Sequence, residues 1–379
     1  MLSPRDIDLA VSRNIISAAQ RQALLRLALP DEVDDTADEQ LRLIGGGNDI
    51  FVTIGILLFM AGGAFALVPL FGERQGLLVG VAAAVIWGLA EIVTRQKRMR
   101  LSSTVLATLF MGCAAYFVAQ GLASQIDLTA LSNNIFALFS LRGTAGWLSM
   151  AGAGAFVGAA ALYFWRFRVP VLAAFIALAL TGYAFFQTGL FLYDGVLAGS
   201  VAVPAADQLP IVLRPALFMP LICGLIVFGV AVMLDLHDRE RRTVWSDCAF
   251  WLHVVSAPML VHPLFVMATG QSLGGMQVAA GGDAVIGLVV LIAVFTYVAL
   301  AIDRRSLLVP TLGYFGTLGV QNLVGGTAVQ AGIPPVALVL ISVGALVIMF
   351  GAGWQRIRHI VVGNTLPKSI LKRLPPITV

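Results

Sequence analysis

Two histidines, His253 and His262, lie in the apolar stretch WLHVVSAPMLVHPLF at residues 251–265, together with Pro258 and Pro263. An imidazole ring can gain or lose a proton near neutral pH, and it can bind a metal ion. In a regular helix, nine residues correspond to about 900° of rotation and about 13 Å of rise. The two rings therefore point in opposite directions and cannot share one metal ion unless the helix is broken.

The two prolines predict such a break. Each proline lacks the amide that would bond to the carbonyl four residues earlier. In lipid, a carbonyl without its donor needs another partner or water. We therefore expect a kink at Pro258 and Pro263 with a small polar cavity beside it. His262 would be better placed there than His253 to meet a solute or a proton. The alternative for each histidine is hydrogen bonding to a neighbouring helix, which is the interpretation we favour for His253.

Side-chain amides recur at one end of the odd-numbered apolar segments. They are Gln120, Gln187, Gln271, Gln321 and Asn322, each close to a glycine. Uncharged donors and acceptors can replace part of the hydration shell of a solute. The amides and the two histidines together form the predicted polar path. The alternative is that helix ends near lipid headgroups simply favour polar residues and glycine.

The acidic residues near the basic loops have a simpler interpretation. Each precedes an arginine by four residues, the order that favours an ion pair on a helix. The pairs are Glu91–Arg95, Asp235–Arg239 and Asp238–Arg242. None of the predicted membrane spans carries Asp or Glu near its middle, which weakens a proton-driven carrier mechanism.

The motifs of hydrolases and metal enzymes are absent from the sequence. There is no H-E-x-x-H, G-x-S-x-G or paired-carboxylate pattern. Cys113, Cys223 and Cys248 are unclustered and lie in or beside apolar runs, as buried structural thiols do. We expect no enzyme activity, no catalytic residue, no metal and no cofactor.

The composition indicates an integral membrane protein. The 379 residues are 59% hydrophobic and 12% charged, with a mean hydropathy of +0.92, whereas soluble proteins have about 25% charged residues. The apolar runs are close to the length that a helix needs to cross about 30 Å of hydrocarbon. The predicted fold class is an all-α, polytopic helical membrane protein whose first partner is the lipid bilayer.

We predict ten spans, at residues 50–70, 76–94, 101–121, 143–164, 170–192, 214–234, 248–269, 284–302, 307–326 and 335–354. Positive charge gathers on the loops of one side, which the charge bias of helical membrane proteins assigns to the cytoplasm, as it does both termini. That side holds Arg95, Lys97, Arg98, Arg100, Arg166, Arg168, Arg239, Arg241, Arg242, Arg304, Arg305, Arg356, Arg358, Lys368, Lys372 and Arg373. Only Arg74, Arg142 and Arg214 fall on the other side. Residues 122–141 are interpreted as an interfacial segment on that other side, because a span there would reverse the bias of the later loops.

The spans divide the chain into four parts: a helical hairpin at residues 1–30, an acidic linker at 31–49, the bundle at 50–354 and a basic tail at 355–379. Ser17 and Gln20 fit a capping box that starts the second hairpin helix, and Asn48 or Asp49 can cap the first span. The glycines and alanines of AGAGAFVGAA at residues 151–160, including Gly154 and Gly158, predict a close helix approach. The scattered basic residues indicate topology and not nucleic-acid binding.

Three stretches carry a resemblance to a known family. They are RNIISAAQRQALLRL, GGGNDIFVTIGILLFMAGG and LVIMFGAGWQRIRHIVV. With this order of parts, the chain resembles a group of bacterial multi-pass membrane proteins, a domain of unknown function with a short N-terminal helical hairpin. The resemblance covers the two ends and the general layout. It implies a multi-pass fold in the bacterial inner membrane and no particular activity.

Two functions remain open from the sequence. The kinked histidine helix favours a small-solute permease or flippase-like protein, which would have a small solute or a lipid as partner. The acidic tether and the missing midplane carboxylates favour a non-transporting scaffold or sensor whose cytoplasmic hairpin binds a protein partner.

Overall fold

The computed structural model describes residues 13, 15–17, 20, 47–72, 74–125, 142–200, 218–238, 241, 243–269, 282–308, 335–371 and 374. Every regular element within these ranges is helical, in agreement with the predicted all-α class. Seven helices are long and apolar enough to cross a membrane, as expected of a multi-pass membrane protein. They lie at Gly47–Phe71, Gln75–Gln96, Arg100–Ala123, Gly143–Phe167, Val171–Leu197, Phe218–His237 and Val244–Met267.

These seven helices coincide with the first seven predicted spans. Helices α13 (Gly282–Ile302) and α16 (Pro335–Thr365) overlap the eighth and the tenth. The predicted ninth span lies outside the described residues, except for residues 307–308. These two residues are at the end of a short 3₁₀ turn, η3 (Arg305–Leu307). Ten spans and two cytoplasmic termini therefore stay predictions.

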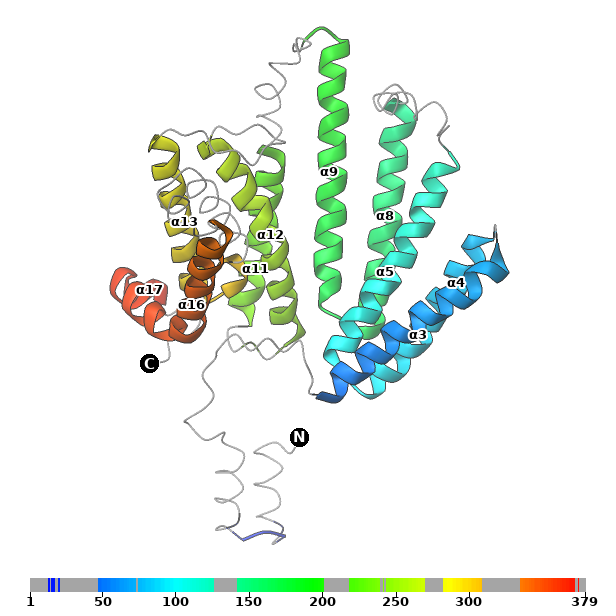
Figure 1. Cartoon of the computed structure of the whole chain (residues 1–379), viewed down its shortest axis with the longest axis horizontal. Coiled ribbons are helices and arrows are strands. Elements are labelled where there is room, and N and C mark those ends of the chain that lie inside the picture. Colours follow the sequence, from blue (N-terminus) through cyan, green and yellow to red (C-terminus); the bar gives the residue numbers. More distant parts are fainter. Residues whose placement is uncertain are drawn as a thin grey trace.

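The first five long helices form one group (Figure 1), which we call the N-terminal group. It comprises α3 (Gly47–Phe71), α4 (Gln75–Ala90) with the π-helical turn η1 (Glu91–Gln96), α5 (Arg100–Ala123), α8 (Arg142–Phe167) and α9 (Val171–Leu197). Its core gathers aromatic rings: Trp87, Phe110, Tyr163 and Phe167 lie with ring centroids 4.6–5.7 Å apart. Edge-on and tilted ring contacts of this kind are favourable, and here they join α4, α5 and α8.

The second group, the C-terminal group, consists of α11 (Phe218–His237), α12 (Val244–Thr269), α13, α16 and the short α17 (Lys368–Leu371). Helix α12 is its centre, because 56% of its spanning segment is buried, compared with 11–22% in the other six spans. Gly224 permits the close approach of α11 to α12, since a Cβ at this position would lie 2.9 Å from Met259 Cβ. Helix α9 is the member of the N-terminal group that lies next to the C-terminal group in Figure 1, and it contacts both α8 and α12.

Tight turns recur at one end of both groups, which we call the basic end after its arginines. Arg98, Arg168, Arg241 and Asp303 each follow a helix that ends there, and each has a positive φ of 52–57°. Residues other than glycine seldom adopt this left-handed conformation. Its repeated use allows the chain to reverse within a few residues at the basic end.

The carboxylate of Asp49 ties the first span to the third. It accepts hydrogen bonds from the backbone amides of Leu101 and Ser102 at 2.9 and 3.0 Å, and from Ser102 Oγ at 2.6 Å. The prediction that Asn48 or Asp49 caps the first span is therefore wrong. Helix α3 already begins at Gly47, and Asp49 caps the beginning of α5 instead.

The small residues of α8 permit the predicted close helix approach at one glycine of the stretch. A Cβ on Gly154 or Gly158 would meet nothing within 4 Å, whereas a Cβ on Gly152 would lie 3.2 Å from both Leu122 and Val118 of α5. The predicted close approach exists in this stretch, but it is centred on a different glycine.

The capping box near the N-terminus is confirmed. Ser17 N donates to Gln20 Oε1 at 2.8 Å, and Gln20 N donates to Ser17 Oγ at 3.2 Å. The remainder of the predicted hairpin, most of the acidic linker and residues 126–141 lie outside the described residues.

Candidate functional site

Ionisable side chains are buried together at the basic end of the C-terminal group. Asp235 lies in the last turn of α11, Ser246 and His253 lie on α12, and Arg304 follows α13. The α11–α12 turn brings the two helices side by side, with Asp235 two residues before the end of α11 and His253 nine residues after the start of α12. All four side chains are buried.

The Asp235 carboxylate is the centre of this group. Its Oδ2 lies 2.9 Å from His253 Nε2 and accepts a hydrogen bond from Arg304 Nε at 3.0 Å. Arg304 Nη2 donates to the other oxygen, Oδ1, so the guanidinium binds the carboxylate in a bidentate manner. Charge-assisted pairing of this kind offsets the cost of removing both ions from water.

The guanidinium of Arg304 also reaches α12. Its Nη2 donates to the carbonyl and the hydroxyl oxygens of Ser246, at 3.2 and 3.1 Å. The pair of Asp235 and Arg304 thereby joins α11, α12 and the end of α13.

His253 is fully buried and packs edge-on against Phe228, with 5.3 Å between the ring centroids. A carboxylate can only accept a hydrogen bond, so Nε2 carries the proton in the bond to Asp235. The second ring nitrogen, Nδ1, has no hydrogen-bond partner among the residues that the structure describes. In this tautomer Nδ1 is a buried acceptor at which a further proton could bind.

A second group of charges surrounds Asp303, the neighbour of Arg304. Trp354 Nε1 donates to Asp303 Oδ1 at 2.6 Å, and Arg241 Nη1 lies 3.4 Å from Oδ2. Arg358 Nη1 lies 3.8 Å from Oδ2, and its Nε donates to the carbonyl of Leu300 at 3.0 Å. These contacts attach α16 and the α11–α12 turn to the end of α13.

Arg358 lies beyond the predicted tenth span and is fully buried. Burial lowers the pKa of its guanidinium, while the nearby Asp303 carboxylate raises this pKa and Arg241 lowers it further. Because the buried Arg358 guanidinium lies close to the Asp303 carboxylate, we expect the position of α16 to depend on Asp303.

The two groups form one network, because Asp303 and Arg304 are consecutive. We call it the polar cluster: Asp235, Arg241, Ser246, His253, Asp303, Arg304, Trp354 and Arg358. Removing one partner of a buried ion pair is costly, because the other charge is then left unpaired in a low-dielectric site. The network can therefore hold four helices in one arrangement, and a change in the charge of one member would disturb all of them.

The two histidines of the predicted polar path lie in different environments. His253 has the expected bond to a neighbouring helix, through Asp235. His262 is exposed on α12. Helix α12 extends from Val244 to Thr269 with Pro258 and Pro263 inside it, and the kink expected at these prolines stays a prediction.

The two amides that the structure describes each bond within their own helix. Gln120 Nε2 donates to the hydroxyl of Tyr116 at 3.2 Å, and Gln187 Nε2 donates to the hydroxyl of Tyr183 at 2.9 Å. Gln187 Nε2 also lies 3.5 Å from the carbonyl of Gly146 on α8. Gln271, Gln321 and Asn322 lie outside the described residues, so the predicted polar path as a whole stays a prediction.

One of the predicted ion pairs is found. Glu91 lies 3.4 Å from Arg95, and it is closer to Arg166 of α8, at 2.6 Å. Asp235 instead turns toward His253 and Arg304. Asp238 Oδ2 accepts hydrogen bonds from the amide and the hydroxyl of Thr243, at 2.7 and 2.6 Å. Arg239 and Arg242, their predicted partners, are outside the described residues.

Most members of the polar cluster could not be recognised from the sequence. Arg304 and Arg358 were interpreted as topology signals, and Ser246, Asp303 and Trp354 were not considered. One signal was available: Asp303 and Arg304 end an apolar helix at the depth where Asp235 ends another, and opposite charges at one depth can pair. The three cysteines are buried or half-buried. No group of three metal-ligating side chains occurs in the described part of the chain.

Comparison with known proteins adds no family to this picture: no family model matches the chain, and no curated protein or solved structure was found to be similar to it. The resemblance to bacterial proteins with an N-terminal hairpin therefore stays a prediction from the three quoted stretches.

Proposed function

We propose that this chain is a small-solute permease or flippase-like membrane protein, and that the polar cluster is its gate at the basic end. The observation that carries the proposal is the buried bond of His253 to Asp235, with Nδ1 of the same ring unused among the described residues. Ionisable residues inside membrane spans are expensive and are typical of solute and proton pathways.

The charges around His253 suggest how such a gate could work. A proton on Nδ1 would make the ring cationic beside Asp235, the carboxylate that Arg304 also binds. Two cations would then compete for one carboxylate, and a second arrangement of Arg304 and Ser246 would become accessible. A buried element with two arrangements is what a membrane gate requires.

The distribution of packing supports access from one side. Buried residues of α5 and α9 gather toward the basic end: Ser102, Ser103, Leu106, Ala107 and Met111 on α5, and Val171, Leu172, Ala174 and Ala177 on α9. Toward the other end of α9, Leu190 is the single buried residue. Helices α5 and α9 are thus packed more tightly at the basic end, as a carrier with its gate shut at that end would be, whereas α12 is buried along most of its length.

Reconstitution of the full chain into liposomes tests the proposal. Entry of glycerol, followed by light scattering, probes solute permeation, and dithionite bleaching of a fluorescent phosphatidylcholine probes lipid flipping. We expect the protein to accelerate at least one process over protein-free liposomes. His253→Gln should lower that rate by about tenfold, which corresponds to an increase of about 1.4 kcal/mol in the activation free energy. His262→Gln, at an exposed position of the same helix, separates the polar cluster from the predicted polar path: the rate should stay unchanged if the gate is at His253, and an effect as large as that of His253→Gln would contradict the gate.

A second candidate is a scaffold or sensor that binds a partner through its N-terminal segment. It is favoured by Ile15, whose side chain is 70% exposed next to the confirmed capping box. If inserted, folded protein accelerates neither probe, the transport proposal is wrong and this second candidate takes its place.

A further inference from the structure

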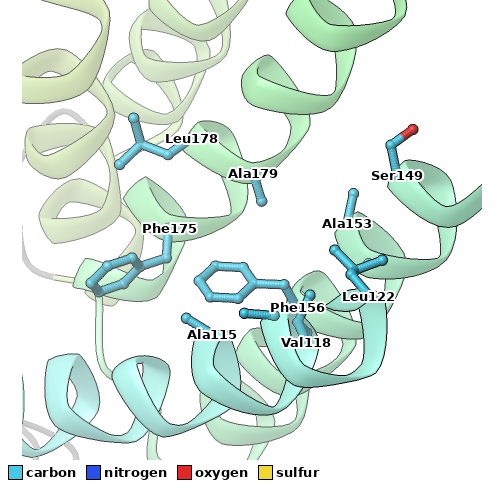
Figure 2. A pocket seen from close by; sticks show the side chains of 11 residues that line it. Ala115, Val118, Leu122, Ser149, Ala153, Phe156, Phe175, Leu178 and Ala179 are labelled. Atoms are coloured by element: carbon cyan, nitrogen blue, oxygen red, sulfur yellow. The ribbon is translucent and has the colours of Figure 1, made fainter. Parts of the chain in front are cut away.

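A pocket of about 430 Å³ lies between α5, α8 and α9 in the N-terminal group (Figure 2). Small side chains create this space, because Ala115, Ala119, Gly152, Ala153 and Ala179 are among the residues that line it. Larger apolar side chains, among them Leu122, Phe156, Phe175 and Leu178, complete the walls. Its volume falls within the range of about 300–1,000 Å³ that is usual for ligand pockets.

The pocket is built by contacts on either side of it. Phe156 and Phe175 meet edge-on at one end, with centroids 6.4 Å apart. Beyond Ser149 at the other end, α8 and α9 meet again through Gly146 and Gln187. Gly152 rests against the side chains of α5 at the back. The two helices are thus held at two levels, and the space between these levels is a property of the fold.

The lining is almost wholly apolar. Its one side-chain hydroxyl, on Ser149, donates to the carbonyl of Gly146 at 2.9 Å. A polar solute would lose its hydration there without replacement, which is unfavourable for each polar group left unpaired. A hydrocarbon would lose nothing, so the chemistry of the walls selects an apolar occupant.

The pocket is continuous with the lipid-facing surface. Leu178 lines it and is also 48% exposed, and Met150 and Leu180, which directly follow the lining residues Ser149 and Ala179 in sequence, are exposed on α8 and α9. In a chain with seven helices suited to a membrane, these side chains face acyl chains.

From this continuity we propose that the pocket binds an acyl chain of a membrane lipid as a specific site. The proposal does not depend on transport, because a bound lipid could equally be a structural component.

Photolabelling of the full chain in liposomes tests the site. The probe is a phosphatidylcholine with a diazirine near the end of one acyl chain, and adducts are mapped by mass spectrometry after irradiation. We expect adducts on pocket residues to exceed those on Leu58 and Phe59, which are exposed on α3, by about tenfold, the factor that corresponds to about 1.4 kcal/mol of preference. Equal labelling of the pocket and of α3 would overturn the proposal without any variant being made.

The second part of the test uses variants in which a larger side chain fills the pocket. Ala153→Phe should remove most pocket adducts, whereas Ala155→Phe, on the exposed side of the same helix, should leave them unchanged. Ala179→Leu fills the space with a smaller side chain if Ala153→Phe does not fold. Pocket labelling that survives in a folded filled variant would overturn the site. A wild-type pocket that is unlabelled in a protein that forms dimers would assign it to a second copy of the chain and overturn the proposal as well.

Discussion

The two helix groups achieve tight packing at the basic end by different chemistry. In the N-terminal group, Trp87, Phe110, Tyr163 and Phe167 interlock as aromatic rings. In the C-terminal group, the helices are joined by charged side chains that pair with Asp235 and Asp303. Because lipid is as apolar as the helix surfaces, the hydrophobic effect does not hold membrane helices together, and specificity must come from shape or from buried polar contacts.

The difference assigns separate properties to the two groups. Aromatic packing has no titratable state within the physiological range, so the aromatic core of the N-terminal group keeps one shape, although the same group also buries the Asp49 carboxylate against α5. Under the proposed function, the polar cluster would change its charge at His253, and the C-terminal group would be the part that responds to a chemical signal. We expect substitutions to reveal this contrast as different sensitivities to the loss of single polar atoms.

The largest effect is expected at Asp235. Asp235→Ala leaves Arg304 and His253 buried without their shared partner, and this should lower the free energy of unfolding by about 3–5 kcal/mol. Unfolding of the purified protein by SDS in mixed micelles measures it. Combining Asp235→Leu with Arg304→Met should restore more than half of the loss, because the unpaired charge is removed. Losses that simply add in the double variant would show that the two side chains are not coupled.

A smaller effect separates the helix contacts of the two groups. Gly224→Ala places a Cβ against the rigid Cβ of Met259, so we expect a loss of about 1–3 kcal/mol from overpacking. Gly152→Ala would bring its Cβ to 3.2 Å from Leu122 Cδ1 and Val118 Cγ1, a less severe approach, and it should cost less. Gly229→Ala, with open space around it on α11, is the control. Thermal unfolding in one detergent ranks the three, and the proposed contrast fails if Gly152→Ala costs as much as Gly224→Ala.

The smallest effect has the opposite sign. The Tyr163 hydroxyl is buried without a hydrogen-bond partner among the described residues. Tyr163→Phe removes this group and keeps the ring, so the protein should be unchanged or more stable by up to about 1 kcal/mol. A thermal shift assay against the parent measures it. A clear loss of stability would show that a polar contact also supports the aromatic core, and the contrast between the two groups would weaken.

The sequence alone determined the elements of this protein. Runs of apolar residues close to the thickness of a bilayer located the seven long helices, because a spanning helix must satisfy its backbone internally and cover itself with apolar side chains. The Ser17–Gln20 cap and the Glu91–Arg95 pair were also predictable, since both partners lie within one turn of each other. These are local properties, and no neighbouring helix is needed to produce them.

Tertiary structure alone decided which polar groups meet. Asp235 has an arginine four residues later, yet its carboxylate bonds to Arg304, which is 69 positions away. Asp49 could have capped its own helix, but it caps α5. The bilayer sets the length and apolarity of each helix, whereas the rotation and neighbours of that helix follow from side-chain packing. Helix periodicity therefore located His253 and His262, and only the packing of α12 buried one of them beside a carboxylate and left the other exposed.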